Sequence, residues 1–68
     1  MKRMSELLAS ARRELALRRR VYPRWVESGR ISPDQAAHEI QCMADICEVI
    51  ELRKTLAEVS EEILNTPS

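Results

Sequence analysis

The chain has 68 residues, and its 11 Lys and Arg balance its 11 Asp and Glu, so the formal net charge is zero. Hydrophobic residues make up 44% of the chain and aromatic residues only 3%, with a single Gly and no Phe. So short a chain forms one small domain and buries little surface, which argues against an enzyme with a deep pocket. The scarcity of aromatic residues disfavours a sheet, and the apolar fraction disfavours disorder. We therefore expect a small all-α protein with a thin core and a tendency to self-associate.

The first predicted helix covers residues 5–28. Apolar residues recur along it at alternating steps of four and three, as in a coiled coil. This stripe contains Met4, Leu8, Ala11, Leu15, Tyr22 and Trp25, with Arg18 at the missing position. Pro23 removes one backbone hydrogen bond and clashes with the preceding turn, so we expect a kink or a brief break near residues 19–23.

A short turn is predicted at residues 29–32. Gly29 can adopt the left-handed conformation that ends a helix. Ser32 is a good N-cap, and Pro33 suits the first position of the next helix. Gln35 stands three residues after Ser32 and can complete a capping box with it. The two helices should therefore fold back on each other as an antiparallel hairpin.

The second predicted helix covers residues 33–64, with a terminating tail at 65–68. It carries two apolar stripes that point in clearly different directions at about 100° per residue. The first stripe consists of Ala36, Ile40, Met43, Cys47, Ile50, Ala57 and Leu64. The second consists of Cys42, Val49, Leu52, Leu56, Val59 and Ile63. One neighbouring helix cannot cover both stripes.

Two interpretations of the second stripe remain open. The C-terminal half of the helix is frayed and its apolar residues are merely exposed, or the stripe packs on another chain. Large apolar patches are rarely left exposed, which favours the second interpretation. Folding the hairpin places Leu15 near Cys47 and lets the second helix overshoot the first by roughly two turns. We expect two hairpins to pair into a four-helix bundle through Val49, Leu52, Leu56, Val59 and Ile63.

The charge is segregated along the chain. Residues 1–30 contain nine Lys or Arg and three Glu, and residues 31–68 contain two basic and eight acidic residues, so the halves carry +6 and −6. A row of arginines on the outer side of the first helix could contact nucleic-acid phosphates. This row consists of Arg12, Arg13, Arg19 and Arg20. Attraction between a basic and an acidic helix explains both halves at once, and a charged protein partner is a third interpretation.

The sequence offers little chemistry. His38 and Cys42 are four residues apart, so they share a helical face, but they make half a metal site at best. A Cys-His catalytic pair also needs an orienting group and an oxyanion hole, and the single glycine belongs to the turn. We expect no catalytic residue, no metal and no cofactor.

The hairpin end carries both aromatic residues. Tyr22 and Trp25 either cap the core, or one of the rings is exposed and anchors a partner, because Trp, Tyr and Arg dominate binding hot spots. The candidate partner-binding residues are Arg18, Tyr22, Arg24, Trp25 and Arg30.

Several features favour a cytoplasmic protein. No window approaches the roughly 18 apolar residues of a membrane span, and the N-terminus lacks the apolar stretch of a secretory signal. Cys42 and Cys47 lie about 140° apart on a helix, so they cannot form a disulfide there and are expected as reduced thiols.

A longer motif spans the turn. It comprises Val21-Tyr22-Pro23, then Gly29-Arg30-Ile31-Ser32, then Ala36, Glu39, Ile40 and Met43. It resembles a group of small, mostly uncharacterised proteins of temperate phages and prophages, over about 60% of the chain.

The resemblance implies a phage origin more firmly than an activity. Small dimeric helical phage proteins commonly bind and inhibit or redirect host proteins, and a phage anti-quorum-sensing protein that binds a host transcription activator is a functional comparison. The expected function is stoichiometric binding of a host transcription regulator or defence component, in the cytoplasm of the host cell. The alternatives are a nucleic-acid-binding accessory protein and a structural phage component.

Overall fold

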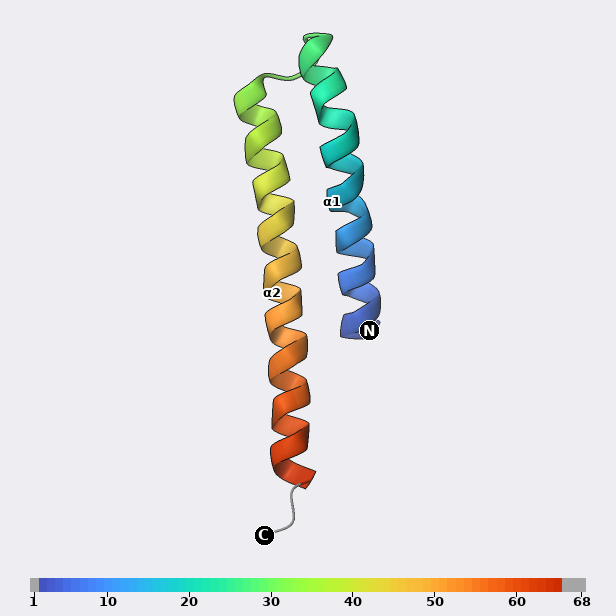
Figure 1. Ribbon diagram of the computed structural model, residues 1–68, viewed down its shortest axis with the longest axis vertical. Helices are drawn as coiled ribbons and strands as arrows, with labels where there is room; N and C mark the ends of the chain where they lie inside the picture. Colours follow the sequence, from blue (N-terminus) through green and yellow to red (C-terminus); the bar gives the residue numbers. More distant parts are fainter. Residues whose placement is uncertain (1, 66–68) are drawn as a thin grey trace.

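The computed structural model describes residues 2–65, which form two helices packed side by side as an antiparallel hairpin (Figure 1). Helix α1 spans Met4–Glu27 and helix α2 spans Pro33–Asn65. No strand occurs within residues 2–65. The molecule is a rod with principal extents of 61 × 19 × 17 Å. The all-α fold with two helices packed against each other is as predicted.

Helix α1 ends in a Schellman motif. The backbone N–H of Arg30 donates to the carbonyl oxygen of Trp25 at 2.8 Å, and the N–H of Gly29 donates to that of Val26 at 3.1 Å. Gly29 has a φ of 77°, the left-handed conformation that this motif needs and that glycine adopts without steric cost. These bonds occupy carbonyl groups that the end of a helix would otherwise leave without partners.

Helix α2 begins with a capping box, as the sequence predicts. The N–H of Gln35 donates to Ser32 Oγ at 3.0 Å, and the N–H of Ser32 donates to Gln35 Oε1 at 3.1 Å. Pro33 is the first helical residue, where its missing N–H costs nothing. The turn therefore ends α1 and starts α2 with hydrogen-bonded backbone groups on both sides. These bonds fix the direction in which α2 leaves the turn.

The brief break considered for residues 19–23 does not occur, because α1 includes Pro23 as an interior residue. Pro23 stands close to the C-terminal end of α1, and its missing N–H removes a single bond to the carbonyl of the exposed Arg19. That carbonyl can be hydrated, and the terminal motif holds the last turn in place. A bend at Pro23 stays a prediction.

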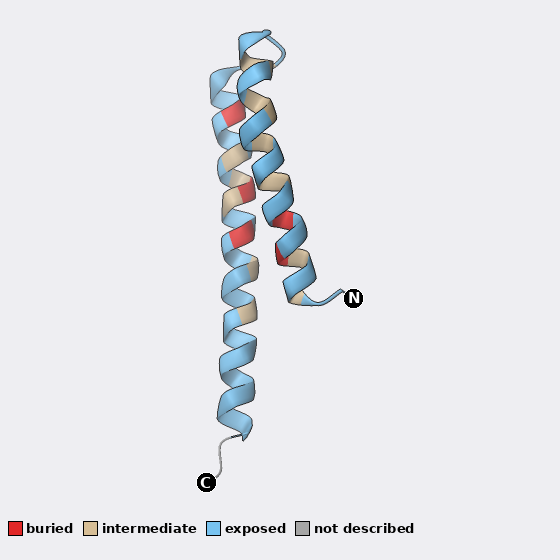
Figure 2. Ribbon diagram, turned by 45° about the vertical axis from the view of Figure 1, so that its right-hand side comes forward, coloured by how far each residue is buried: buried red, intermediate tan, exposed pale blue. Residues whose placement is uncertain are grey.

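The core between the helices is narrow (Figure 2). Its buried cluster consists of Leu8, Ala11, Met43 and Cys47, and Leu15 and Ile50 pack against it. Ala36 is buried nearer the turn. The first stripe of α2 therefore faces α1 as far as Ile50, and Leu15 packs against the cluster that contains Cys47, near which it was predicted to lie.

The first stripe does not continue to Ala57 and Leu64, which are exposed. Helix α2 has 33 residues and α1 has 24, so α2 extends well past the N-terminal end of α1 (Figure 1). Nothing within residues 2–65 covers this extension on the α1 side. The predicted tail is also shorter at its start, because Asn65 is helical, and residues 66–68 lie outside the described residues.

Replacing Gly29 tests the Schellman motif at the end of α1. The change Gly29→Ala should lower the free energy of unfolding by about 1–2 kcal/mol, because an L-residue pays for a left-handed conformation. A Cβ at this position meets no atom within 4 Å, so steric collision does not complicate the result. Urea unfolding at one fixed protein concentration measures the change. Ser60→Ala, in exposed helix, is the control, and equal stability of the two variants would contradict the assignment.

Candidate partner-binding surfaces

The outer side of α2 is an exposed apolar face, which we call the α2 seam. It consists of Val49, Leu52, Leu56, Val59 and Ile63, whose exposed fractions run from 44% to 68%. The structure therefore brings together on one face all five residues predicted from the sequence for a dimer interface. Ile46 also exposes 47% of its surface beside the seam. Ile46 was not predicted from the sequence, although its place one turn before the seam could have indicated it.

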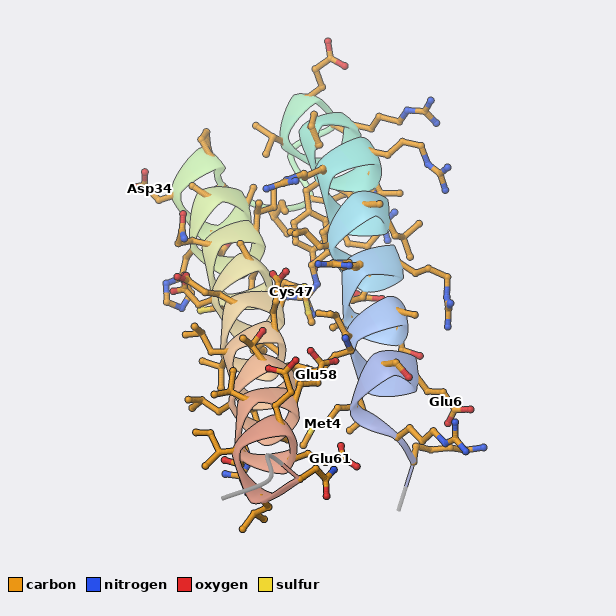
Figure 3. The ribbon with its side chains drawn as sticks, turned by 60° about the horizontal axis from the view of Figure 1, so that its bottom comes forward. Met4, Glu6, Asp34, Cys47, Glu58 and Glu61 are labelled. Carbon is orange, nitrogen blue, oxygen red and sulfur yellow. The ribbon has the colours of Figure 1, made fainter. Side chains whose placement is uncertain are left out.

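The α2 seam lies opposite the core. At about 100° per residue, the mean direction of the seam is about 180° from the mean direction of the α2 residues that face α1. Figure 3 shows carbon-rich side chains on the side of α2 turned away from α1. The helix thus has apolar residues on two opposite sides, and the hairpin covers one of them.

The other candidate surface is the turn end of the hairpin. The rings of Tyr22 and Trp25 are stacked, with centroids 5.2 Å apart and an interplanar angle of 25°. Both side chains are half-buried. The guanidinium of Arg30 lies 4.8 Å from the centroid of the Trp25 ring, a distance at which cation–π attraction operates. The rings therefore stabilise the turn and keep part of their surface exposed.

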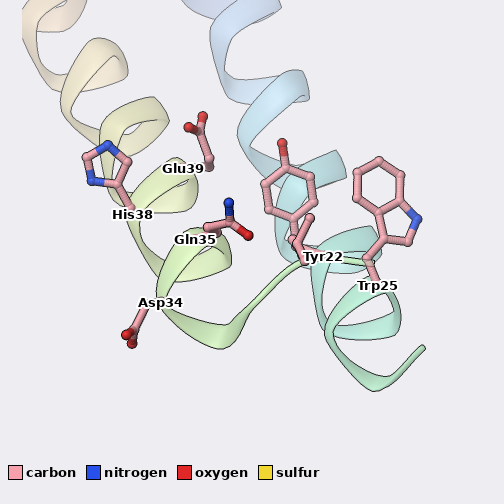
Figure 4. A pocket seen from close by; sticks show the side chains of 7 residues that line it. Tyr22, Trp25, Asp34, Gln35, His38 and Glu39 are labelled. Atoms are coloured by element: carbon pink, nitrogen blue, oxygen red, sulfur yellow. The ribbon is translucent and has the colours of Figure 1, made fainter. Parts of the chain in front are cut away.

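Two open grooves flank this ring pair. One, of about 490 Å³, lies between the rings and the start of α2 (Figure 4). It is lined by Tyr22, Trp25, Ile31, Asp34, Gln35, His38 and Glu39. The other, of about 320 Å³, runs along α1 and is lined by Glu14, Leu17, Arg18, Val21, Tyr22 and Trp25. Both grooves share the ring pair, so one aromatic ridge is accessible from both sides.

Arg18 links the two helices. Its Nε donates to Glu14 Oε1 at 3.0 Å, and its Nη1 donates to the carbonyl oxygen of Glu39 at 2.9 Å and lies 3.4 Å from Glu39 Oε2. Its guanidinium also lies 6.0 Å from the centroid of the Tyr22 ring. The hydrogen bond that Arg18 donates to the Glu14 carboxylate raises the pKa of Arg18 above its ordinary value. The contact with Glu14 therefore favours the charged form of the guanidinium.

The candidate partner-binding arginines have unequal surroundings. Arg18 and Arg30 are engaged within the chain, on acidic and aromatic groups respectively. Arg24 is exposed and forms no ion pair with any residue from 2 to 65. Of the five candidates, Arg24 and the uncovered parts of Tyr22 and Trp25 are available to a partner.

The four arginines considered for nucleic acid also differ. Arg12 Nη2 lies 3.2 Å from Glu51 Oε1, so it reaches across to α2. Arg13 Nη2 donates to Ser10 Oγ at 2.9 Å within α1. Arg19 and Arg20 are exposed and form no ion pair among the described residues. The row is therefore exposed, but one member is neutralised by the acidic helix.

His38 and Cys42 lie side by side, with 3.5 Å between His38 Nε2 and Cys42 Sγ. Within residues 2–65, no group of three or more His, Cys, Asp or Glu side chains is placed to hold a metal ion. Cys42 and Cys47 are both free thiols, the first half-buried and the second buried. Neither α1 nor α2 has, in its described part, the apolar length needed to span a membrane.

Comparison with models of protein families, with curated protein sequences and with solved structures finds no match for this chain. The resemblance to small phage proteins therefore stays a prediction from the motif alone.

Removing the Arg18 side chain should lower the free energy of unfolding by about 1–2 kcal/mol, because Arg18→Ala leaves the Glu39 carbonyl and two carboxylates without their shared donor. Arg20→Ala removes the same charge from an exposed site and should change stability by less than about 0.5 kcal/mol. Thermal and urea unfolding of both variants provide the measurement. A loss that is equal in the two variants would show that net charge, and not the Arg18 contacts, is responsible.

Proposed function

We propose that this chain is a non-enzymatic protein-binding module that dimerises through α2 and acts by stoichiometric binding to another protein. The exposure of the α2 seam carries the proposal. Exposing five large apolar side chains in one row to water is unfavourable for a monomer, and such rows usually mark an interaction site. A binding role also needs no buried reactive group, and the turn end offers open grooves of about 490 and 320 Å³.

The turn end is the proposed site for the second protein. Its aromatic ridge offers the residue types that dominate hot spots, and it is held in place by the terminal motif and by Arg18. Preorganisation of this kind lowers the entropy lost on binding. The α2 seam and the ridge lie on different parts of the rod, so dimerisation and partner binding can occur together.

The motif around the turn suggests the biological setting of this binding. In that setting the chain is a phage or prophage product in the host cytoplasm, and its partner is a host transcription regulator or defence component that it inhibits or modulates. A structural role in the phage particle is an alternative, which co-purification with virions would favour.

Nucleic-acid binding is the second candidate, and the exposure of Arg19 and Arg20 favours it. The acidic helix beside α1 opposes it, because an overall basic surface normally accompanies such binding. A salt-sensitive gel shift that disappears when Arg12, Arg13, Arg19 and Arg20 are neutralised would establish it, and absence of a shift at low salt would exclude it.

Placing a charge in the α2 seam should abolish the dimer. In Leu56→Asp, a carboxylate replaces an apolar side chain at the middle of the contact, where it would be desolvated without a partner. Sedimentation equilibrium should give the mass of a dimer for the natural sequence and of a monomer for the variant. Leu64→Asp makes the same exchange at an exposed position outside the seam and should stay dimeric. A Leu56→Asp variant that keeps the dimer mass would refute this interface.

Truncating the aromatic ridge should weaken partner binding by roughly tenfold or more, since Trp25→Ala removes a hot-spot side chain. Affinity capture from host lysate with quantitative mass spectrometry compares Trp25→Ala, Arg24→Glu and Leu56→Asp with the natural sequence. Arg24→Glu changes an exposed side chain that has no ion pair among the described residues. It should leave the turn folded, so a loss of binding in this variant cannot be ascribed to unfolding of the turn. Partners retained equally by both turn-end variants would exclude the ridge as the binding site.

A further inference from the structure

We infer that the α2 seam takes a second copy of this chain in parallel and in register, so that two α2 helices form a coiled coil with the two α1 helices on the outside. This rests on the self-association proposed above, and it adds the direction and the arrangement of the helices. Four observations carry it: the direction of the seam, its spacing, the charges beside it and the residue that precedes it.

The direction of the seam favours helices in a row. In a closed four-helix bundle each helix contacts neighbours that lie at about a right angle to each other around its axis. The seam and the core side of α2 are instead about 180° apart. A second α2 therefore meets the first one back to back, and the order across the assembly becomes α1, α2, α2 and α1. This arrangement in a row differs from a closed form of the four-helix bundle expected from the sequence.

The spacing of the seam is that of a coiled coil. Its residues follow one another at steps of three, four, three and four, which assigns Val49, Leu56 and Ile63 to heptad position a and Leu52 and Val59 to position d. In a parallel pair in register, each of these side chains meets its own copy, and all five layers are apolar.

An antiparallel pair cannot satisfy the whole seam. In that direction each a residue packs beside a d residue of the other helix, and the seam has three a residues but two d residues. Aligning Leu52 with Leu56 of the other copy places Ile63 against Asp45, which occupies the d position before Val49. The same alignment brings Arg53 next to its own copy. This register therefore loses an apolar layer and gains repulsion, and in every antiparallel register at least one a residue of the seam lacks a d residue of the seam opposite it.

The charges beside the seam complement each other in the parallel pair. Glu48 stands at heptad position g and Arg53 at the following position e, and the g and e residues of neighbouring parallel helices lie side by side. Neither side chain forms an ion pair with any residue from 2 to 65, whereas the neighbouring Lys54 is paired with Glu58 at 2.8 Å. The pair contains this opposite-charge contact twice, once on each side.

Asp45 sets the upper limit of the coiled coil. Parallel pairing would bring two Asp45 carboxylates together at a d position, so the helices diverge before Val49. Asp45 is instead exposed and accepts a hydrogen bond from Gln41 Nε2 at 2.9 Å. The contact therefore runs from Val49 to Ile63, and above it the two hairpins separate with both turns at the same end.

Disulfide cross-linking tests the direction. Leu52→Cys, in a Cys42→Ser background that removes the half-buried thiol, should form a covalent dimer on mild oxidation, because a parallel pair places position 52 beside its own copy. Leu64→Cys, exposed and outside the seam, should remain uncrosslinked. Absence of a Leu52→Cys cross-link in a protein that sediments as a dimer would overturn the parallel arrangement.

Charge exchange tests the same pairing without cysteine. Glu48→Arg and Arg53→Glu should each raise the dimer dissociation constant several-fold, and the double exchange should restore it, since opposite charges again face each other. Glu61→Arg changes the net charge equally at an exposed position away from the seam and should leave the constant unchanged. A double exchange that is weaker than both single variants would overturn the parallel arrangement, whereas a natural sequence that sediments as a monomer would overturn self-association itself.

Discussion

The structure depends on one constraint: α2 is apolar on two opposite sides, and α1 is placed to cover one of them over only part of its length. The cover extends as far as Ile50, because α1 has 24 residues and α2 has 33. Past Ile50 every described residue of α2 except the half-buried Lys54 is exposed, and the whole α2 seam, which begins at Val49, is exposed as well. A single hairpin cannot relieve this, since a chain of two helices has one interhelical surface. The exposed side must therefore be hydrated or contact another molecule, and the proposed function rests on the second possibility.

Charged and apolar side chains contribute differently to the packing of α1 on α2. The net charge of zero conceals a basic helix packed on an acidic one. Within residues 2–65, Arg12 with Glu51 and Arg18 with Glu39 form ion pairs that join α1 to α2. Exposed pairs such as the first contribute little stability. Arg18 matters more, because it fills a gap in the apolar stripe of α1 and bonds to a backbone carbonyl of α2. A directional bond at that point opposes sliding of one helix along the other, which apolar contacts alone resist weakly.

The fold could be predicted from the sequence because its signals are local. Gly29 predicts the end of one helix, because glycine readily adopts the left-handed conformation, and Ser32 and Gln35 predict the start of the next, because they can form a capping box. The structure confirms all three roles. The stripe facing α1 could be predicted only as far as α1 extends, and its last two members, Ala57 and Leu64, are exposed. The surroundings of the arginines could not be predicted, because their long side chains reach partners on another helix. The brief break considered near Pro23 does not occur for a related reason, since the lost hydrogen bond falls where the helix is exposed and already ending.

The narrow core ties the behaviour of this protein to its abundance. The described residues bury five side chains, two of them alanines, and none is fully enclosed. So small a core gives a lone hairpin little stability of its own. Under the proposed association, each dimer formed withdraws hairpins from the unfolded pool by mass action, and stability rises with concentration. At low concentration the chain would then unfold more often and be degraded quickly by proteases, whereas rapid synthesis would favour the more stable dimer. In this way, expression level itself can act as a threshold switch.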